Sequence, residues 1–273
     1  MRTQVLTLLL LFIGAIIACN NFDFGGIRDR FKDNMNGTLF NPGNIDPAGT
    51  DAFSFAVMGD SHTGVSWGRV LPSAAQHSQA AGDAFVVLAG DVTNFGKEEE
   101  FAEFMKVFSD LGMAFRAVIG NHDLYFDGWK SYSKFLGRSI YSFDADNVHF
   151  SMIDTGNGVL GEPQLNWLKS DLENTTQPIK IVVSHYPAIS ADFDTLNKMA
   201  SEEEAAILKN MLNKYQVNIM FAGHYHGYRA KQLGFTNYIV TGGINTVLDP
   251  GNDKHYVRVT VNGNMVSVHK IDL

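Results

Sequence analysis

The sequence predicts a mixed α/β domain, and two observations support this prediction. From residue 53 onward, short apolar runs bounded by glycine alternate with amphipathic stretches of helical spacing. The last third of the chain instead contains apolar runs separated by turn residues, which is typical of antiparallel strands. With 45% hydrophobic and 18% charged residues, the 273-residue chain can bury a large core, which excludes disorder throughout.

The first half of this domain has the pattern of a βαβαβ unit. Three apolar runs are predicted as buried strands: 53–58, 84–89 and 114–119. Two stretches between them have helical spacing: 68–81 and 97–111. In the second stretch four apolar side chains share one face, which we interpret as core: Phe101, Phe104, Met105 and Phe108. Because such strands run parallel, their carboxyl ends are expected at one edge of a sheet.

The second half predicts further strands and two helices. A hairpin is expected from the runs 140–143 and 148–153, and helices are expected over 161–172 and 202–215. The remaining strands are expected at 179–183, 217–221, 238–241, 256–261 and 264–271. Two stretches, 127–138 and 157–161, are expected to be loops that set specificity.

The N-terminus resembles that of a bacterial lipoprotein. An apolar run of 14 residues, 5–18, follows Arg2 and is too short to span a bilayer comfortably, so 1–18 is predicted to be a signal peptide. The sequence Ile-Ile-Ala-Cys that ends at Cys19, the only cysteine, resembles a lipobox. The alternatives are a plain signal peptide with a chance cysteine, or an uncleaved anchor. The lipoprotein reading predicts lipid attachment at Cys19 and an extracytoplasmic, membrane-anchored protein, periplasmic or at the cell surface.

The rest of the chain divides into two parts on composition. Residues 19–51 are rich in Asn, Asp and Gly and are expected to form a lipid-attached tether, with one short packed piece at 27–31. Residues 52–273 are expected to form the functional domain. The formal net charge of −8 and the lack of a basic run argue against a nucleic-acid-binding surface.

Polar side chains with metal-binding chemistry follow the predicted strands. They are Asp60, His62, Asp91, Asn121, His122, Asp123, His185, His224 and His226. Taken singly, most of these motifs have an ordinary reading as a turn, a helix cap or a structural histidine. The pair of imidazoles in Gly-His-Tyr-His-Gly, at 223–227, favours metal binding by itself. Shared placement at strand ends predicts one common site.

In their order and spacing, these motifs resemble those of the calcineurin-like metallophosphoesterases. The resemblance covers 53–273 and implies two β-sheets packed face to face with helices outside. It implies that Asp60, His62, Asp91 and His226 bind one metal ion. It also implies that a second ion is bound by Asp91, Asn121, His185 and His224. His122 is implied to be the proton donor, held by the carboxylate of Asp123.

The resemblance also implies a reaction and its cofactors. Two divalent or mixed-valence ions are expected, and the nitrogen and oxygen ligands suit Zn, Mn, Fe, Co or Ni. The expected activity is hydrolysis of small phosphomonoesters or phosphodiesters by in-line attack of a metal-bridging hydroxide. Arg229 and Arg69 are candidate phosphate contacts. The alternative is a surface lipoprotein that binds metal or an organic phosphate without catalysis.

The chain departs from three of the family's better-known branches at one position each. The residues after Asp91 lack the Arg of protein Ser/Thr phosphatases, which argues against that activity. Asn94 stands where purple acid phosphatases have Tyr, so an iron-tyrosinate chromophore is not expected. Extracellular 5′-nucleotidases usually have Glu where this chain has Asp123, which weakens that reading without excluding it.

Overall fold

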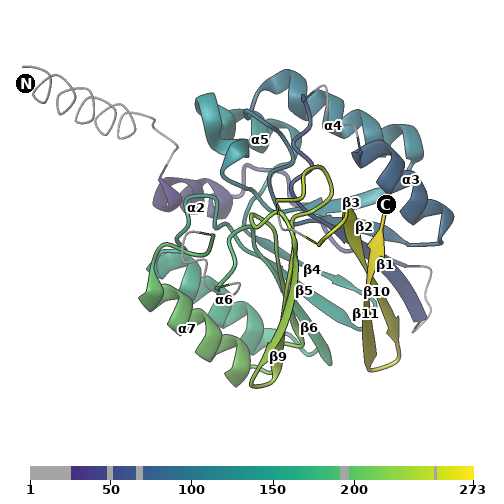
Figure 1. The fold of residues 1–273 in the computed structure, drawn as a ribbon. Helices are drawn as coiled ribbons and strands as arrows, with labels where there is room; N and C mark the ends of the chain where they lie inside the picture. Colours follow the sequence, from purple (N-terminus) through teal and green to yellow (C-terminus); the bar gives the residue numbers. More distant parts are fainter. Residues whose placement is uncertain (1–25, 48–51, 66–69, 191–196, 249–250) are drawn as a thin grey trace, which may run out of the picture.

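Two β-sheets pack face to face at the centre of the structure, with helices on both outer faces (Figure 1). The structure is a computed structural model, and it describes residues 26–47, 52–65, 70–190, 197–248 and 251–273. The predicted α/β architecture, a two-sheet sandwich flanked by helices, is confirmed.

The first sheet has five strands in the order β11-β10-β1-β2-β3. Its strands are β1 (Ala52–Met58), β2 (Phe85–Leu88), β3 (Ala114–Ala117), β10 (His255–Asn262) and β11 (Met265–Asp272). β1, β2 and β3 are parallel, whereas β10 and β11 pair antiparallel at the other edge. The parallel part of this sheet is therefore the predicted βαβαβ unit.

The second sheet has six strands in the order β4-β5-β6-β7-β9-β8. Its strands are β4 (Tyr141–Ala145), β5 (Val148–Met152), β6 (Ile179–Val183), β7 (Ile219–Ala222), β8 (Tyr228–Leu233) and β9 (Thr236–Thr241). β5, β6, β7 and β9 run parallel to one another. The antiparallel hairpin β4–β5 begins where the sequence predicts it.

Aromatic side chains from both sheets fill the space between them. Phe55 of β1 stacks on Phe85 of β2, with ring centroids 5.0 Å apart. Its ring also meets Phe150 of β5 edge to face at 5.3 Å, and Phe150 stacks on Phe143 of β4. These four rings are almost completely buried, and alternate residues of β1 point to the opposite face. Burial on both faces explains why the strands read as continuous apolar runs.

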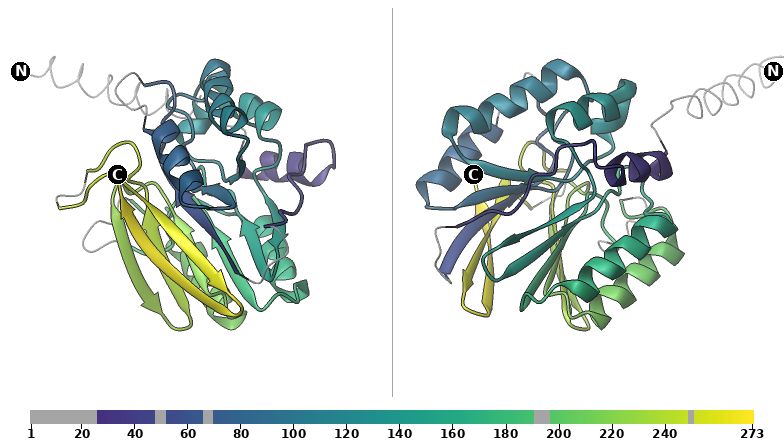
Figure 2. Two further views of the ribbon diagram at one scale, coloured as in Figure 1. Left: turned by 90° about the vertical axis from the view of Figure 1, so that its right-hand side faces the viewer. Right: turned by 180° about the vertical axis from the view of Figure 1, so that it is seen from behind.

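Helices cover the two outer faces (Figure 2). On the first sheet lie α3 (Leu71–Ala80), α4 (Glu98–Leu111) and α5 (Gly128–Phe135). On the second sheet lie α6 (Glu162–Asn174) and α7 (Glu202–Lys214). In α4 the predicted core face is confirmed, since Phe101, Phe104 and Phe108 are buried. None of the helices in the described ranges has the length and apolar character needed to cross a membrane.

Two elements differ from the sequence expectation. The stretch 127–138 was expected to be a loop, but most of it forms α5, preceded by a 3₁₀ segment at His122–Asp127. A helix that begins at glycine and has only eight residues carries little sequence signal. The edge strand β8 was also not predicted, because four of its six residues are exposed and its apolar alternation is weak.

The segment expected to be a tether packs on the domain over its described part. The packed piece expected at 27–31 is longer and forms helix α2 (Ile27–Met35). Its Arg30 makes a two-pronged ion pair with Asp154, Nε to Oδ2 and Nη2 to Oδ1, each at 2.8 Å, and both side chains are fully buried. Asn34 accepts hydrogen bonds from the backbone of Ser139 and Ile140. Residues 26–47 are therefore bound to the domain, although their composition is that of a linker.

We expect Arg30→Met to destabilise the protein by about 3–5 kcal/mol, because it leaves the buried carboxylate of Asp154 without its charged partner. Chemical denaturation measures the free energy of unfolding. The control is Lys32→Met on the same helix, whose exposed pair with Asp29 contributes at most about 1 kcal/mol. Equal losses in the two variants would contradict a structural role for α2.

Candidate metal centre

Five loops at the carboxyl ends of strands bring the predicted ligands together. Asp60 and His62 follow β1, Asp91 follows β2 and Asn121 follows β3. From the other sheet, His185 follows β6, and His224 and His226 follow β7. The site therefore lies where the parallel strands of both sheets end, as the placement of the motifs predicts.

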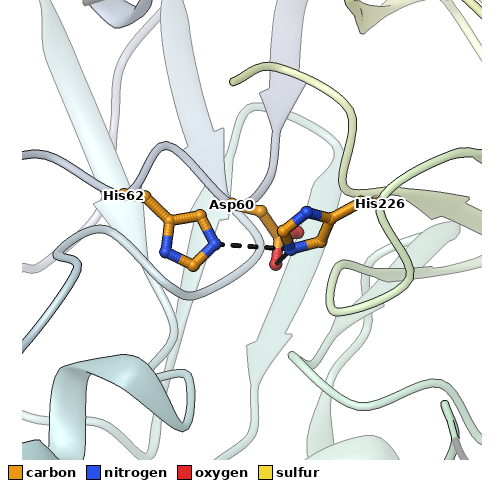
Figure 3. Close-up of side chains that lie close together, drawn as sticks. All are labelled: Asp60, His62 and His226. Atoms are coloured by element: carbon orange, nitrogen blue, oxygen red, sulfur yellow. Dashed lines mark hydrogen bonds and ion pairs between the residues drawn. The ribbon is translucent and has the colours of Figure 1, made fainter. Parts of the chain in front are cut away.

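One group of possible ligands consists of Asp60, His62 and His226 (Figure 3). The Nε2 atoms of His62 and His226 are 3.3 Å apart, and Nε2 of His226 is 3.4 Å from Oδ1 of Asp60. Asp60 is fixed from behind, since its carboxylate accepts a hydrogen bond from the backbone N–H of His224. The group thus joins the loop after β1 to the loop after β7.

A second group consists of Asp91, His185 and His224. Nε2 of His185 is 3.4 Å from Oδ2 of Asp91 and 3.2 Å from Nδ1 of His224. The amide oxygen of Asn121 lies 3.0 and 3.1 Å from the same two imidazole nitrogens. His185 donates through Nδ1 to the carbonyl of Ala89, which leaves the lone pair of Nε2 facing the group.

Asp91 lies between the two groups. Its Oδ2 atom, 3.4 Å from His185, is also 3.9 Å from Nε2 of His62. Its Oδ1 atom accepts a hydrogen bond from the backbone of His122, whose side chain forms a third group with His62 and Asp91. One carboxylate therefore faces possible ligands from both sheets.

The residues present fit divalent metal ions. Ligands about 2.0–2.2 Å from one ion lie about 3 Å from each other. The possible ligand atoms of each group lie within 4.8 Å of one another, and several neighbouring pairs in the first two groups are 3.0–3.4 Å apart. All donors are imidazole nitrogens or carboxylate and amide oxygens. This donor set suits first-row transition metals and zinc, and it contains no thiolate.

Burial determines the charge states around the site. It lowers the pKa of His62 and His185 to about 4 and that of His224 to about 3, so these imidazoles are neutral near pH 7 and able to bind metal. Burial, with the nearby charges of Asp60 and Asp123, raises the pKa of Asp91 well above its ordinary value. A cation beside Asp91 would offset the free-energy cost of keeping its buried carboxylate charged.

The backbone of the site is strained at several of the possible ligands. Four of the possible ligands have positive φ angles although none is glycine: Asp60 at 58°, His62 at 43°, Asp91 at 49° and His224 at 65°. Such conformations persist only where surrounding structure enforces them, and they concentrate at functional sites. Glycine is required at position 120, because a Cβ there would lie 2.1 Å from Oδ1 of Asp91.

The structure corrects the relation expected between His122 and Asp123. Nδ1 of His122 donates to the backbone carbonyl of Asn94 at 2.8 Å, not to the carboxylate of Asp123. Asp123 is fully buried and accepts hydrogen bonds from the backbone of Gly120 and from the backbone and hydroxyl of Thr93. Asp123 therefore ties the loop after β2 to the loop after β3. The expected relation came from the family resemblance, whereas the partner in this chain is a backbone carbonyl from the loop after β2.

The two predicted phosphate contacts remain predictions. Arg229 lies at the start of β8, where its guanidinium packs over the ring of Tyr225 at 5.4 Å and donates to the carbonyl of Tyr228. Arg69 and Cys19 lie outside the described residues, as does the signal peptide predicted at 1–18.

Two further residues shape the site and were not found from the sequence. The ring of Tyr186 packs on His224 with centroids 3.8 Å apart. Burial, with the charges of Asp91 and Asp60, raises the pKa of Tyr186 above its ordinary value, so its phenol keeps its proton. Thr155, after β5, accepts hydrogen bonds from the backbone N–H groups of His185 and Tyr186. The position of Tyr186 beside His185 was a usable signal, whereas Thr155 gave none.

Comparison with known proteins agrees with this arrangement. The sequence profile described as calcineurin-like phosphoesterase matches residues 53–228. A probable cyclic nucleotide phosphodiesterase of Fibrobacter succinogenes is 24% identical over 60% of this chain and 66% of its own. Purple acid phosphatase 23 of Arabidopsis thaliana is 36% identical over 32% of this chain and 20% of its own. The chain thus spans less than two thirds of each of these curated relatives.

The fold also matches a solved structure of low sequence identity. A purple acid phosphatase from yellow lupin (Lupinus luteus) seeds superposes with a TM-score of 0.66 at 15% identity. The match covers 85% of this chain and 52% of the lupin protein.

We expect Asp91→Asn to weaken metal binding at least about 100-fold, because it removes the charge that faces both groups. It should not destabilise the metal-free protein, since burial raises the pKa of Asp91 and so disfavours its charged form there. Elemental analysis and thermal unfolding with and without metal measure the two effects. Asp171→Asn, in a carboxylate–histidine pair outside the site, is the matched control. Normal metal content in Asp91→Asn would contradict its shared position.

Proposed function

Since the chain belongs to the calcineurin-like phosphoesterase family, we propose that it hydrolyses small phosphomonoesters or phosphodiesters with two bound divalent metal ions. The position of the Asp91 carboxylate carries this proposal. Asp60, His62 and His226 would hold one ion, and Asn121, His185 and His224 would hold the other. Asp91 would contact both.

Metal ions bound in this way supply an activated water molecule and positive charge for phosphate oxygens. The protein's part is to hold the ligands in fixed positions before substrate arrives. The bond from His185 to Ala89 and the close contact between Gly120 and Asp91 both serve this purpose. Zn, Mn, Fe, Co and Ni all match the donor set.

In this proposal His122 donates a proton to the departing alcohol. Its Nδ1–H is engaged by the carbonyl of Asn94, so Nε2 is the atom that can gain and give a proton. Burial lowers the pKa of His122, which favours release of that proton. The negative charge of bound phosphate would raise the pKa again and allow protonation in the complex. A histidine that gains a proton in the substrate complex and then releases it is suited to act as a general acid.

Both mono- and diesters belong in the proposal. Among the relatives, the Fibrobacter protein is named as a probable cyclic nucleotide phosphodiesterase and the Arabidopsis protein as a phosphatase. The Arg typical of protein Ser/Thr phosphatases is missing after Asp91, which favours small substrates over phosphoproteins.

We expect the purified protein to hydrolyse aryl phosphate mono- or diesters in the presence of one of these metals, and to lose this activity with a chelator. His122→Ala should lower kcat about 10²–10⁴-fold while metal content stays normal, since His122 acts on the leaving group. His269→Ala, an exposed histidine of β11, is the control. Steady-state kinetics with elemental analysis measures both quantities.

Two outcomes would contradict this proposal. A metal-loaded protein that binds phosphate esters tightly but never releases alcohol would be the non-catalytic binding lipoprotein. Full activity in the metal-free protein would show that the site works in another way.

We propose further that Cys19 carries lipid and holds the domain outside the cytoplasm, close to a membrane. Helix α2 begins at Ile27, so seven residues, 20–26, separate it from Cys19. Seven residues span at most about 25 Å when fully extended. The buried ion pair between Arg30 and Asp154 would then hold the domain to the lipid-anchored N-terminus.

We expect Cys19→Ser to move the protein from the membrane fraction to the soluble fraction, because the anchoring acyl chains would be lost. Cell fractionation and mass spectrometry of the mature N-terminus measure this change. A wild-type protein with an unmodified Cys19 would rule the lipid anchor out.

A further inference from the structure

Two phenylalanine side chains are exposed on the loops that hold His122. Phe95 is 42% exposed and Phe126 is 63% exposed, and their rings meet edge to face with centroids 6.2 Å apart. Phe95 directly follows Asn94, whose carbonyl binds His122, and Phe126 follows Tyr125, whose ring lies 4.8 Å from that of His122. Each member of the aromatic pair Phe95–Phe126 is therefore the chain neighbour of a residue that contacts His122, which would protonate the leaving group.

The loops that carry this pair are rigid. The backbone N–H of Phe95 donates to Glu100 at 2.8 Å. The two loops also interlock at Gly96, where a Cβ would lie 2.6 Å from the carbonyl oxygen of Tyr125 and 2.8 Å from that of Asp123. An exposed apolar pair on a fixed backbone loses little entropy when a ligand covers it.

Backbone strain distinguishes Phe126 from an ordinary surface residue. Its φ and ψ are 51° and 46°, a left-handed conformation that is unfavourable for a bulky side chain. The next residue, Asp127, has a φ of 66°. The left-handed conformation of Phe126 costs free energy, and its ring is 63% exposed. Neither the conformational preference of phenylalanine nor burial in the core therefore explains this conformation.

We infer that the aromatic pair Phe95–Phe126 binds a flat aromatic group on the alcohol part of the substrate, such as a nucleobase. This inference rests on the proposed function and names its substrate class. Stacking of a base on an aromatic side chain contributes about 1–3 kcal/mol and does not depend on the identity of the base. Lys97, 5.6 Å from the centroid of Phe95, adds positive charge beside the pair. The substrates would be phosphate esters of nucleosides or other aromatic alcohols.

The test compares two esters that differ in the aromatic group. AMP and glycerol 3-phosphate serve as monoesters, and their methyl esters serve as diesters. We expect Phe126→Ala to lower the ratio of kcat/KM for the nucleotide over the glycerol ester about 5–100-fold, because stacking is lost. Phe126→Tyr should largely keep the wild-type ratio, because tyrosine retains an aromatic ring on which the base can stack.

Phe235→Ala is the matched control, since Phe235 is 45% exposed in the turn between β8 and β9. An unchanged ratio in Phe126→Ala overturns the inference. If the ratio is unchanged and Phe126→Ala co-sediments less with lipid vesicles than the wild-type protein does, the pair instead contacts a membrane surface.

Failure of the proposed function can be separated from failure of this inference. If the wild-type protein hydrolyses no ester, calorimetry measures its affinity for AMP and for glycerol 3-phosphate. A preference for AMP that disappears in Phe126→Ala supports the aromatic pair without catalysis. Equal affinities for the two ligands overturn it.

Discussion

The site depends on the burial of two carboxylates, Asp60 and Asp91, beside the imidazoles of His62, His185 and His224, which burial keeps neutral. Burial removes the hydration of the Asp91 carboxylate, and the charge of Asp60 repels it. Both effects raise the pKa of Asp91. Cations are the natural compensation for such an arrangement. The same burial that makes the metal-free site electrostatically unfavourable therefore prepares it for divalent ions.

The fold holds this arrangement by joining the two sheets at their carboxyl ends. The backbone of His224 binds Asp60, and the side chain of His185 binds the carbonyl of Ala89, so each sheet fixes possible ligands of the other. The positive φ angles of four possible ligands show that the loops are forced into these positions. The aromatic core between the sheets supplies the rigidity that this strain requires.

Residues outside the possible ligands complete the support. Thr155 holds the backbone of His185 and Tyr186, and its neighbour Asp154 is paired with Arg30 of α2. The N-terminal helix is thereby coupled to the loop that carries a ligand. On the other side, Asp123 ties together the two loops that position His122 and carry the aromatic pair Phe95–Phe126. The positioning of His122 and the proposed substrate contact thus depend on the same two loops.

The sequence by itself determined the α/β class, the parallel strands and the possible metal ligands at their ends, because periodicity and strand-end motifs are local signals. It could not assign Asn94 as the partner of His122 or show that α2 is packed, because these depend on contacts between segments distant in the chain. Helix α5 and strand β8 were missed for a related reason: both are short, and neighbouring elements, not their own residues, stabilise them. Only the tertiary structure decided which loops meet, and so which carboxylate lies between the two groups.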